Sequence, residues 1–143
     1  MKYNAIIRIE GHQQIDGEAS PVNELTTQGK YRFTEKHVEL SYSESELTGL
    51  EGTETTFMAK ADEVILSRKG TVTAQMIFHK GQKHTFMYET AYGTMTMRLD
   101  TLHIKNELEK NGGRLEIEYD INFETAQISR NKFIIDVKTQ KTS

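Results

Sequence analysis

Apolar and polar residues alternate along most of this chain, from about residue 37 to its end. The two clearest runs are Met-Thr-Met-Arg-Leu-Asp-Thr at residues 95–101 and Leu-Glu-Ile-Glu-Tyr-Asp-Ile at residues 115–121. Alternation with a period of two indicates a β-strand that has one face in the core and the other in water. Many short strands of this kind, joined by tight turns, predict an all-β protein that is either a closed barrel or a sandwich.

The segments between the alternating runs are short. Thr34–Lys36, Lys69–Gly70 and Lys80–Lys83 have the composition of hairpin turns. Short links favour an antiparallel meander, because parallel strands need long crossover connections. We expect about ten strands, near residues 3–10, 26–33, 37–44, 52–59, 62–68, 72–79, 84–91, 93–101, 113–123 and 131–138.

Two segments do not alternate. The stretch from Gly11 to Glu24 is polar and weakly patterned, and we expect it to be a loop or an irregular edge. Residues Ile104–Lys110 have helical propensity, and Asn111–Gly113 has the residues that stop a helix. We therefore expect one short helix that caps an end of the barrel.

The composition excludes several classes of protein. The chain has 143 residues, enough for one domain (1–143) that needs no disulfide or metal for stability. The absence of cysteine excludes disulfides, a thiol nucleophile and cysteine-ligated zinc. A net charge of −3 argues against nucleic-acid binding. No apolar run approaches the ~20 residues of a membrane helix, and charges interrupt the N-terminus before a signal-peptide core, so we expect a cytoplasmic protein without a membrane partner.

A set of short motifs follows in a fixed order from about Tyr31 to Lys138. The motifs are Tyr42-x-Glu44, Leu47-Thr48-Gly49, Thr55, Val64-x-Leu66-x-Arg68-x-Gly70, Met76-x-Phe78, Tyr88-x-Thr90-x-x-Gly93, Thr101, Gly113-x-Leu115-x-Ile117-x-Tyr119 and Asn131. In this order and spacing they resemble the YwiB-like family of uncharacterised bacterial proteins. The resemblance implies a calycin-type (lipocalin-like) barrel, for which we expect about 8–10 strands, in a cytoplasmic bacterial protein. It implies no reaction.

Two charged residues fall on inward-facing rows of the predicted strands. Glu44 shares its face with the apolar Leu40 and with Tyr42, and Arg68 shares its face with Leu66. Each charge is the last inward residue of its strand. Alternate strands of a meander run in the same direction, so these strand ends should meet at one mouth of the barrel.

We predict that this mouth holds a ligand-binding site. Its candidate residues are Tyr42, Glu44, Thr55, Arg68, Tyr88 and Thr90. Arg68 and the tyrosine hydroxyls would bind the polar head of a small amphipathic ligand such as a carboxylate. The alternative is an internal ion pair and hydrogen-bond network that plugs the barrel end, because inward charges need partners with or without a ligand. In both cases Glu44 and Arg68 should interact directly or through Tyr42 or Tyr88.

Methionines give a weaker indication of a cavity. Met76, Met95 and Met97 fall on inner rows, where they either line an adaptable cavity or fill an ordinary core. On the outer rows, four apolar residues lie on successive strands and predict a homodimer interface: Met58, Ile65, Ile77 and Met87. Scattered surface residues, or cover by the N-terminal segment, are the alternatives.

No motif of known catalytic or metal-binding chemistry is present. His79 and His84 flank a hairpin, but they fall on opposite rows, so we expect no metal site and no cofactor. We expect a non-catalytic barrel that binds a small amphipathic or apolar ligand. The alternative is a solid-core barrel that acts as a homo-oligomeric interaction module. An enzyme that uses Glu44 and Arg68 is a third reading, and we predict no catalytic residue.

Overall fold

The computed structural model describes residues 2–15, 17–44, 50–123 and 127–140. The motif at Leu47–Gly49 lies outside these residues. The described chain contains strands, turns and loops but no helix, and so no helix that could cross a membrane. The strands are β1 (Lys2–Ile15), β2 (Glu18–Ala19), β3 (Asn23–Phe33), β4 (Val38–Ser43), β5 (Thr53–Ala59), β6 (Glu63–Gly70), β7 (Ala74–His79), β8 (Lys83–Thr90), β9 (Gly93–Glu109), β10 (Gly112–Phe123) and β11 (Gln127–Gln140).

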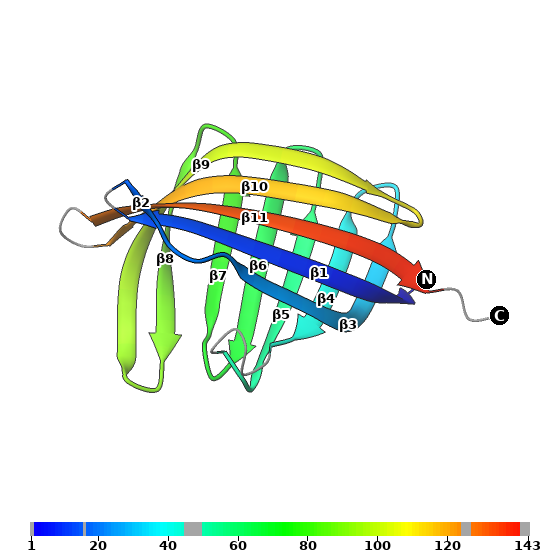
Figure 1. Ribbon diagram of the computed structural model, residues 1–143, viewed down its shortest axis with the longest axis horizontal. Helices are drawn as coiled ribbons and strands as arrows, with labels where there is room; N and C mark the ends of the chain where they lie inside the picture. Colours follow the sequence, from blue (N-terminus) through cyan, green and yellow to red (C-terminus); the bar gives the residue numbers. More distant parts are fainter. Residues whose placement is uncertain (1, 16, 45–49, 124–126, 141–143) are drawn as a thin grey trace.

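The strands form one antiparallel sheet that curls into a nearly closed barrel (Figure 1). The order in the sheet is β7-β6-β5-β4-β3-β1-β11-β10-β9-β8, and β2 pairs with the end of β1. From β3 to β7 and from β8 to β11, strands that are consecutive in sequence are hydrogen-bonded neighbours, and β1 joins the two runs by pairing with β3 and β11. The predicted all-β antiparallel meander is therefore confirmed.

The sheet folds into two layers that pack on each other. In Figure 1 the strands β9, β10, β11, β1 and β3 lie in front of β4 to β8, and the two layers run crosswise. The ring of Phe78 packs against Tyr119 with centroids 4.9 Å apart, and Phe57 meets Phe133 edge-on at 6.2 Å. Aromatic side chains from both layers thus fill the middle of the barrel, and the hollows described below lie at its end and along its wall.

Burial alternates along the strands as the sequence predicts. In β5 the odd-numbered residues are buried and the even-numbered ones are more exposed. Met76 is buried and Met97 half-buried. Met95 lies on the same inner face, opposite Tyr88, but it is 36% exposed. It lies near the tip of the β8–β9 hairpin, where Tyr92 is fully exposed and the other layer no longer covers the inner face.

The predicted helix at Ile104–Lys110 is wrong, because this segment belongs to β9. The register between β9 and β10 shifts beside Glu118, which leaves Leu102 as an extra residue in β9. Such a β-bulge reverses which residues face inward. Thr101 is buried before the bulge and Leu108 after it, so the inward positions change from odd to even numbers. Across the bulge the period-two pattern is lost, and the remaining residues resemble a short helix.

The expected loop or irregular edge at 11–24 is also largely wrong. β1 continues to Ile15, and β3 already begins at Asn23, which pairs with Gly11. The inward row of β1 passes through Gly11, so it has no apolar side chain there to mark the strand. Outward polar residues of the same segment form ion pairs on the surface, such as His12 with Glu10 and Glu24 with Arg8.

Candidate functional site

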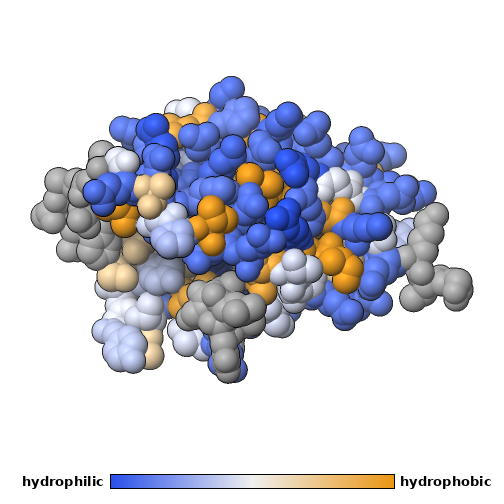
Figure 2. All heavy atoms as spheres, viewed as in Figure 1, coloured by the Kyte–Doolittle hydropathy of each residue, from blue (hydrophilic) through white to orange (hydrophobic). Residues whose placement is uncertain are grey.

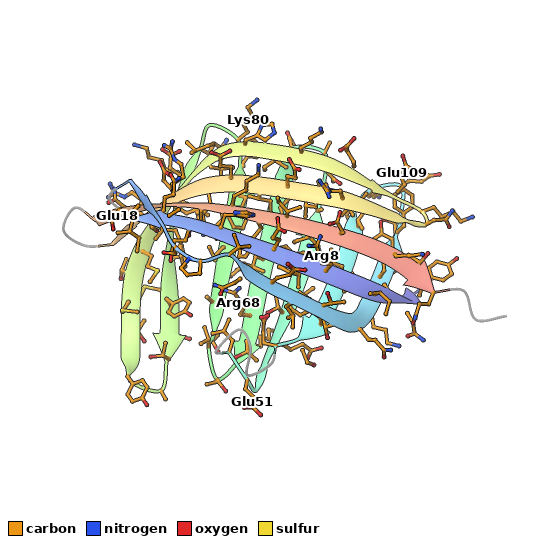
Figure 3. The ribbon with its side chains drawn as sticks, viewed as in Figure 1. Arg8, Glu18, Glu51, Arg68, Lys80 and Glu109 are labelled. Carbon is orange, nitrogen blue, oxygen red and sulfur yellow. The ribbon has the colours of Figure 1, made fainter. Side chains whose placement is uncertain are left out.

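The ends of β4, β6 and β8 lie at the same end of the barrel, as the meander predicts (Figure 1). Tyr42 of β4 is the cross-strand partner of Thr55, and Thr55 is in turn the partner of Arg68 on β6. Directly opposed residues of antiparallel strands have neighbouring side chains on the same face. These three residues therefore form one row on the inner face, and Figure 3 shows Arg68 near the lower ends of its neighbouring strands.

A pocket of about 150 Å³ opens at this mouth. Three of the predicted residues line it, namely Tyr42, Glu44 and Arg68. The rest of its wall comes from the facing layer and from the residue that follows the undescribed segment: Ile9, Gly11, Asn23, Glu24, Leu25, Leu50 and Phe133. The pocket combines one buried acid, one arginine and several apolar side chains, which is the composition of a site for a small amphipathic molecule.

Glu44 is a buried acid at the mouth, with 7% of its surface exposed. Its backbone N–H donates to the carbonyl oxygen of Thr53 at 2.8 Å, which continues the β4–β5 pairing by one residue. Burial raises the pKa of the Glu44 carboxyl, and the opposing effects of the Arg68 charge and of the Tyr42 and Thr55 hydroxyls do not cancel this rise. The neutral form of Glu44 is therefore favoured more than in a free glutamate.

Glu44 and Arg68 are coupled by their charges, but they form no direct ion pair in the part of the chain that the structure describes. Tyr42 senses both. Burial raises the pKa of its hydroxyl most, the Glu44 charge raises it further, and the Arg68 charge lowers it. Tyr42, Glu44 and Arg68 line the same pocket, and an interaction of the two charges through Tyr42 stays a prediction.

Arg68 has an unusual environment for a guanidinium. Its Nε is buried and has no hydrogen-bond partner among the described residues, and the same holds for the hydroxyl of its neighbour Thr55. Its charge also acts on the phenol of Tyr119, whose pKa burial raises. Buried donors are nearly always paired in folded proteins. Arg68 therefore combines a buried Nε that has no partner among the described residues with a side chain that lines the pocket.

The structure does not bring Tyr88 and Thr90 to this pocket. Tyr88 is half-buried and packs against the edge of the core. The Thr90 hydroxyl donates to the carbonyl of Gly93 at 3.1 Å and accepts the N–H of Tyr92 at 3.1 Å, so it stabilises the β8–β9 turn. The predicted cluster is therefore wrong in these two members.

Tyr119 is a residue that the sequence reasoning missed. Its position in the alternating run 115–121 marks it as inward-facing. Alternation within a strand does not show which residues meet across the barrel, and Tyr119 comes from the opposite layer. Its closeness to Arg68 follows only from the packing of the two layers.

A family model described as "Domain of unknown function (DUF1934)" matches residues 7–135. The chain belongs to the DUF1934 family. It is 27% identical over 118 residues to the uncharacterized β-barrel protein YwiB of Bacillus subtilis (strain 168), an alignment that covers 82% of this chain and 77% of that protein. The crystal structure of the B. subtilis ywiB protein superposes with a TM-score of 0.86 at 23% identity, over 98% of this chain and 94% of that one. The YwiB-like resemblance is therefore confirmed, and so is the barrel fold.

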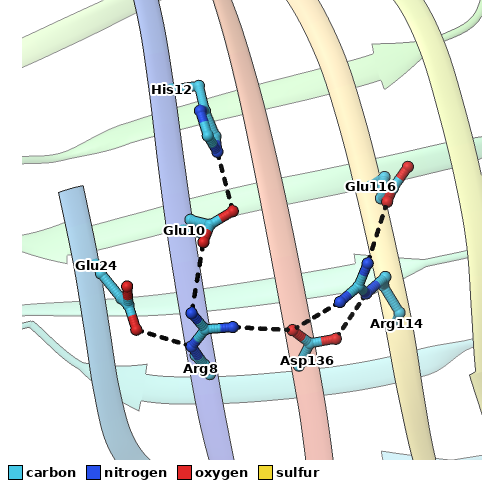
Figure 4. A network of polar contacts seen from close by, with 7 residues as sticks. All are labelled: Arg8, Glu10, His12, Glu24, Arg114, Glu116 and Asp136. Carbon is cyan, nitrogen blue, oxygen red and sulfur yellow. Dashed lines mark hydrogen bonds and ion pairs between the residues drawn. The ribbon is translucent and has the colours of Figure 1, made fainter. Parts of the chain in front are cut away.

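The outer face of this DUF1934 barrel is strongly charged over β3, β1, β11 and β10. Figure 2 shows a mostly hydrophilic surface there. Arg8 Nε lies 2.8 Å from Glu24, and its Nη1 lies 3.8 Å from Asp136. Arg114 pairs with the same aspartate at 2.8 Å and with Glu116 at 3.7 Å (Figure 4). We call this network, with Glu10 and His12, the outer ion-pair network.

A second hollow of the DUF1934 barrel is not a candidate ligand site. A hollow of about 420 Å³ lies over the outer faces of β3 to β6, lined by residues such as Lys30, Glu39 and Ser41. None of its lining residues has a buried unpaired side-chain group. It is a depression in a solvated face, which sets it apart from the smaller pocket at the mouth.

The histidines do not converge on a metal. His79 lies 3.7 Å from Asp62, whereas the ring of His84 stacks on Phe86. Within the described ranges, no three His, Asp or Glu side chains are grouped closely enough to hold a metal ion.

The predicted outer apolar band is shorter than expected. Met58, Ile65 and Ile77 are direct cross-strand partners on β5, β6 and β7, and each is half-buried. Met87 on β8 is 53% exposed, but the bridge between Thr73 and Glu89 sets it opposite a different residue of β7. The band therefore has three members in register.

Proposed function

We propose that this DUF1934 protein is a non-catalytic barrel that binds a small amphipathic carboxylate at the mouth, with Arg68 as the anchor. The buried Nε of Arg68, unpaired and beside a pocket, carries the proposal. A guanidinium presents donors in a planar fork that matches a carboxylate. Ile9, Leu25 and Phe133 line the same pocket and supply apolar surface for the rest of the ligand.

Glu44 fits this proposal in its neutral form. A charged Glu44 would repel a bound carboxylate, whereas a protonated one donates a hydrogen bond to it. The raised pKa of Glu44 favours that form. The second acid of the pocket wall, Glu24, is exposed and paired with Arg8. We infer binding rather than catalysis, because the described residues that line the pocket include no second buried acid or base beside Glu44.

The test is calorimetric titration of the protein with propanoate and butanoate. These acids suit a pocket of about 150 Å³, smaller than the roughly 300–1,000 Å³ typical of sites for drug-sized ligands. We expect Arg68→Met to weaken binding at least about tenfold, the effect of losing a charge-assisted hydrogen bond. Arg114→Met removes an outer arginine and serves as the matched control. Equal affinity in the wild type and Arg68→Met would contradict the proposal.

A second candidate function is a homo-oligomeric interaction module. The in-register band of Met58, Ile65 and Ile77 supports it, because contiguous apolar surface favours an isologous contact between two copies. We expect Ile77→Glu to shift a dimer towards monomer in sedimentation velocity. Gln75→Glu, two residues away on the same outer face of β7, is the control. A wild type that is monomeric at high concentration would rule out this candidate.

A further inference from the structure

The barrel wall is interrupted between β7 and β8. These strands are joined by a short turn in which Gln82 N–H donates to the His79 carbonyl at 2.9 Å. Beyond the turn, the backbone hydrogen bonds that join the two segments in the described chain are those of the bridge between Thr73 and Glu89, both 2.9 Å long. No ladder joins residues 74–78 to residues 84–88, all of which the structure describes. We call this stretch the seam.

A groove of about 620 Å³ follows the seam. Its lining comes from three strands: Ser67, Arg68 and Lys69 of β6, Ala74 and Gln75 of β7 with Thr73 before it, and His84, Thr85, Phe86, Met87 and Glu89 of β8. Arg68 is also part of the wall of the mouth pocket. One arginine therefore borders both hollows.

Apolar side chains lie incompletely covered beside this groove. Phe86 faces the core and is 5% exposed, whereas Met87 on the other face of β8 is 53% exposed. Along the inner face of the hairpin, Tyr88 and Met97 are half-buried and Met95 is 36% exposed. Of these residues, Phe86 and Met87 line the groove itself, which they share with Arg68.

We propose that the ligand is an unbranched alkyl monocarboxylate whose chain lies in the seam groove while its carboxylate is on Arg68. This inference rests on the proposed function and names its ligand class. A compact acid needs only the mouth pocket, with its volume of about 150 Å³. A long chain needs a second hollow that touches the same cation, and the seam groove supplies it, with Ala74, Phe86 and Met87 as the apolar residues of its wall.

The first measurement is the affinity for saturated acids from propanoate to dodecanoate, each below its micelle concentration. Burial of one methylene contributes about 0.8 kcal/mol, so affinity should rise up to about fourfold per added carbon. The rise should stop when the chain is longer than the groove. Arg68→Met should weaken binding of every acid in the series.

The second measurement blocks the groove. Because the chain has no cysteine, Gln75→Cys gives one site on the groove wall for a bulky maleimide. Labelling should weaken decanoate binding at least about tenfold, the loss expected for two or more uncovered methylenes, and leave propanoate binding unchanged. Labelled Glu107→Cys, on the outer side of β9, is the control. Thr85→Cys replaces Gln75→Cys if thermal unfolding shows that the labelled variant is not folded.

The outcomes separate the two proposals. An affinity that does not rise with chain length, or decanoate binding unaffected by labels at the seam, overturns the chain-in-seam inference. Arg68-dependent binding of propanoate would then still support the proposed function. If no acid of any length binds in an Arg68-dependent way, both proposals are wrong.

Discussion

The barrel has two contrasting arginine environments. On the outer face, Arg8 and Arg114 each have carboxylate partners and remain exposed to water. At the mouth, Arg68 has a buried Nε that finds no hydrogen-bond partner in the part of the chain that the structure describes. Exposed ion pairs contribute little to stability, because water solvates their charges nearly as well as the partners do. A buried unpaired donor is costly. The difference teaches that the arginine with the fewest polar partners, and not the densely paired ones, is the one on which the proposed binding site depends.

The largest effect should come from removing the inner cation. We expect Arg68→Met to lower the free energy of unfolding at neutral pH by about 1–3 kcal/mol, because Glu44 loses the positive charge that offsets its burial. The loss should be smaller in a Glu44→Gln background. Urea unfolding of both single variants and the double variant measures this coupling. Strictly additive effects would show that the two residues are independent.

The pH dependence sharpens the same contrast. The folded-state pKa of Glu44 is raised, so its contribution to stability is fully present below the unfolded-state pKa of about 4.3 and is lost as pH rises through the folded-state value. Glu44→Gln should therefore become more stable relative to the wild type between acidic and neutral pH. Urea unfolding across this range tests the trend. Glu107→Gln, on an exposed position, controls for loss of one carboxylate, and a trend of opposite sign would refute the assignment.

A smaller effect on stability is expected from two buried hydroxyls that differ in their hydrogen bonding. Tyr31 donates to the carbonyl of Glu109 at 2.5 Å, whereas the Thr55 hydroxyl has no partner among the described residues. Tyr31→Phe should cost about 0.5–1.5 kcal/mol, because the carbonyl loses its donor. Thr55→Val, which keeps the shape, should be neutral or stabilising. Thermal unfolding measures both, and equal losses would show that Thr55 has a partner in solution.

The smallest effect should come from the outer ion-pair network. We expect Arg114→Met to leave the unfolding midpoint in 0.5 M salt nearly unchanged, because Asp136 keeps Arg8 as a partner and salt screens exposed charges over about 10 Å already at 0.1 M. Urea unfolding at low and high salt measures this. A loss as large as that of Arg68→Met would remove the contrast between the two environments.

Alternation in the sequence predicted much of the fold, because the inward positions of each half-buried strand are mostly apolar and the outward positions mostly polar. It also placed Tyr42, Glu44, Thr55 and Arg68 correctly on that face. It failed at Leu102, since one bulged residue reverses the pattern for the rest of β9. The bulge lies within β9, and neither Leu102 nor its neighbours is a residue type that marks a bulge in the sequence.

The candidate site was only partly predictable for a different reason. The alternation along a strand and the direction of the chain assign a residue to one face of the sheet and one end of the barrel. They do not give distances across the barrel. Thr90 lies at the end of β8, as predicted, but its hydroxyl donates a hydrogen bond within the β8–β9 turn. The alternation shows that Tyr119 faces inward. That the Arg68 charge acts on it depends on how the two crosswise layers pack.

The ladder between β1 and β11 extends from the pair Asn4–Gln140 to the pair Ile15–Ser129. The first and last strands of the chain are therefore direct neighbours, and the barrel closes only when both are present. During synthesis, one edge of β1 stays unpaired until its partner strand β11 has been made. Contacts of such long sequence separation slow folding, and an exposed edge invites pairing with other chains. The order of synthesis thus makes closure of this barrel a late event, with the N-terminal strand as the segment most exposed to mispairing before it.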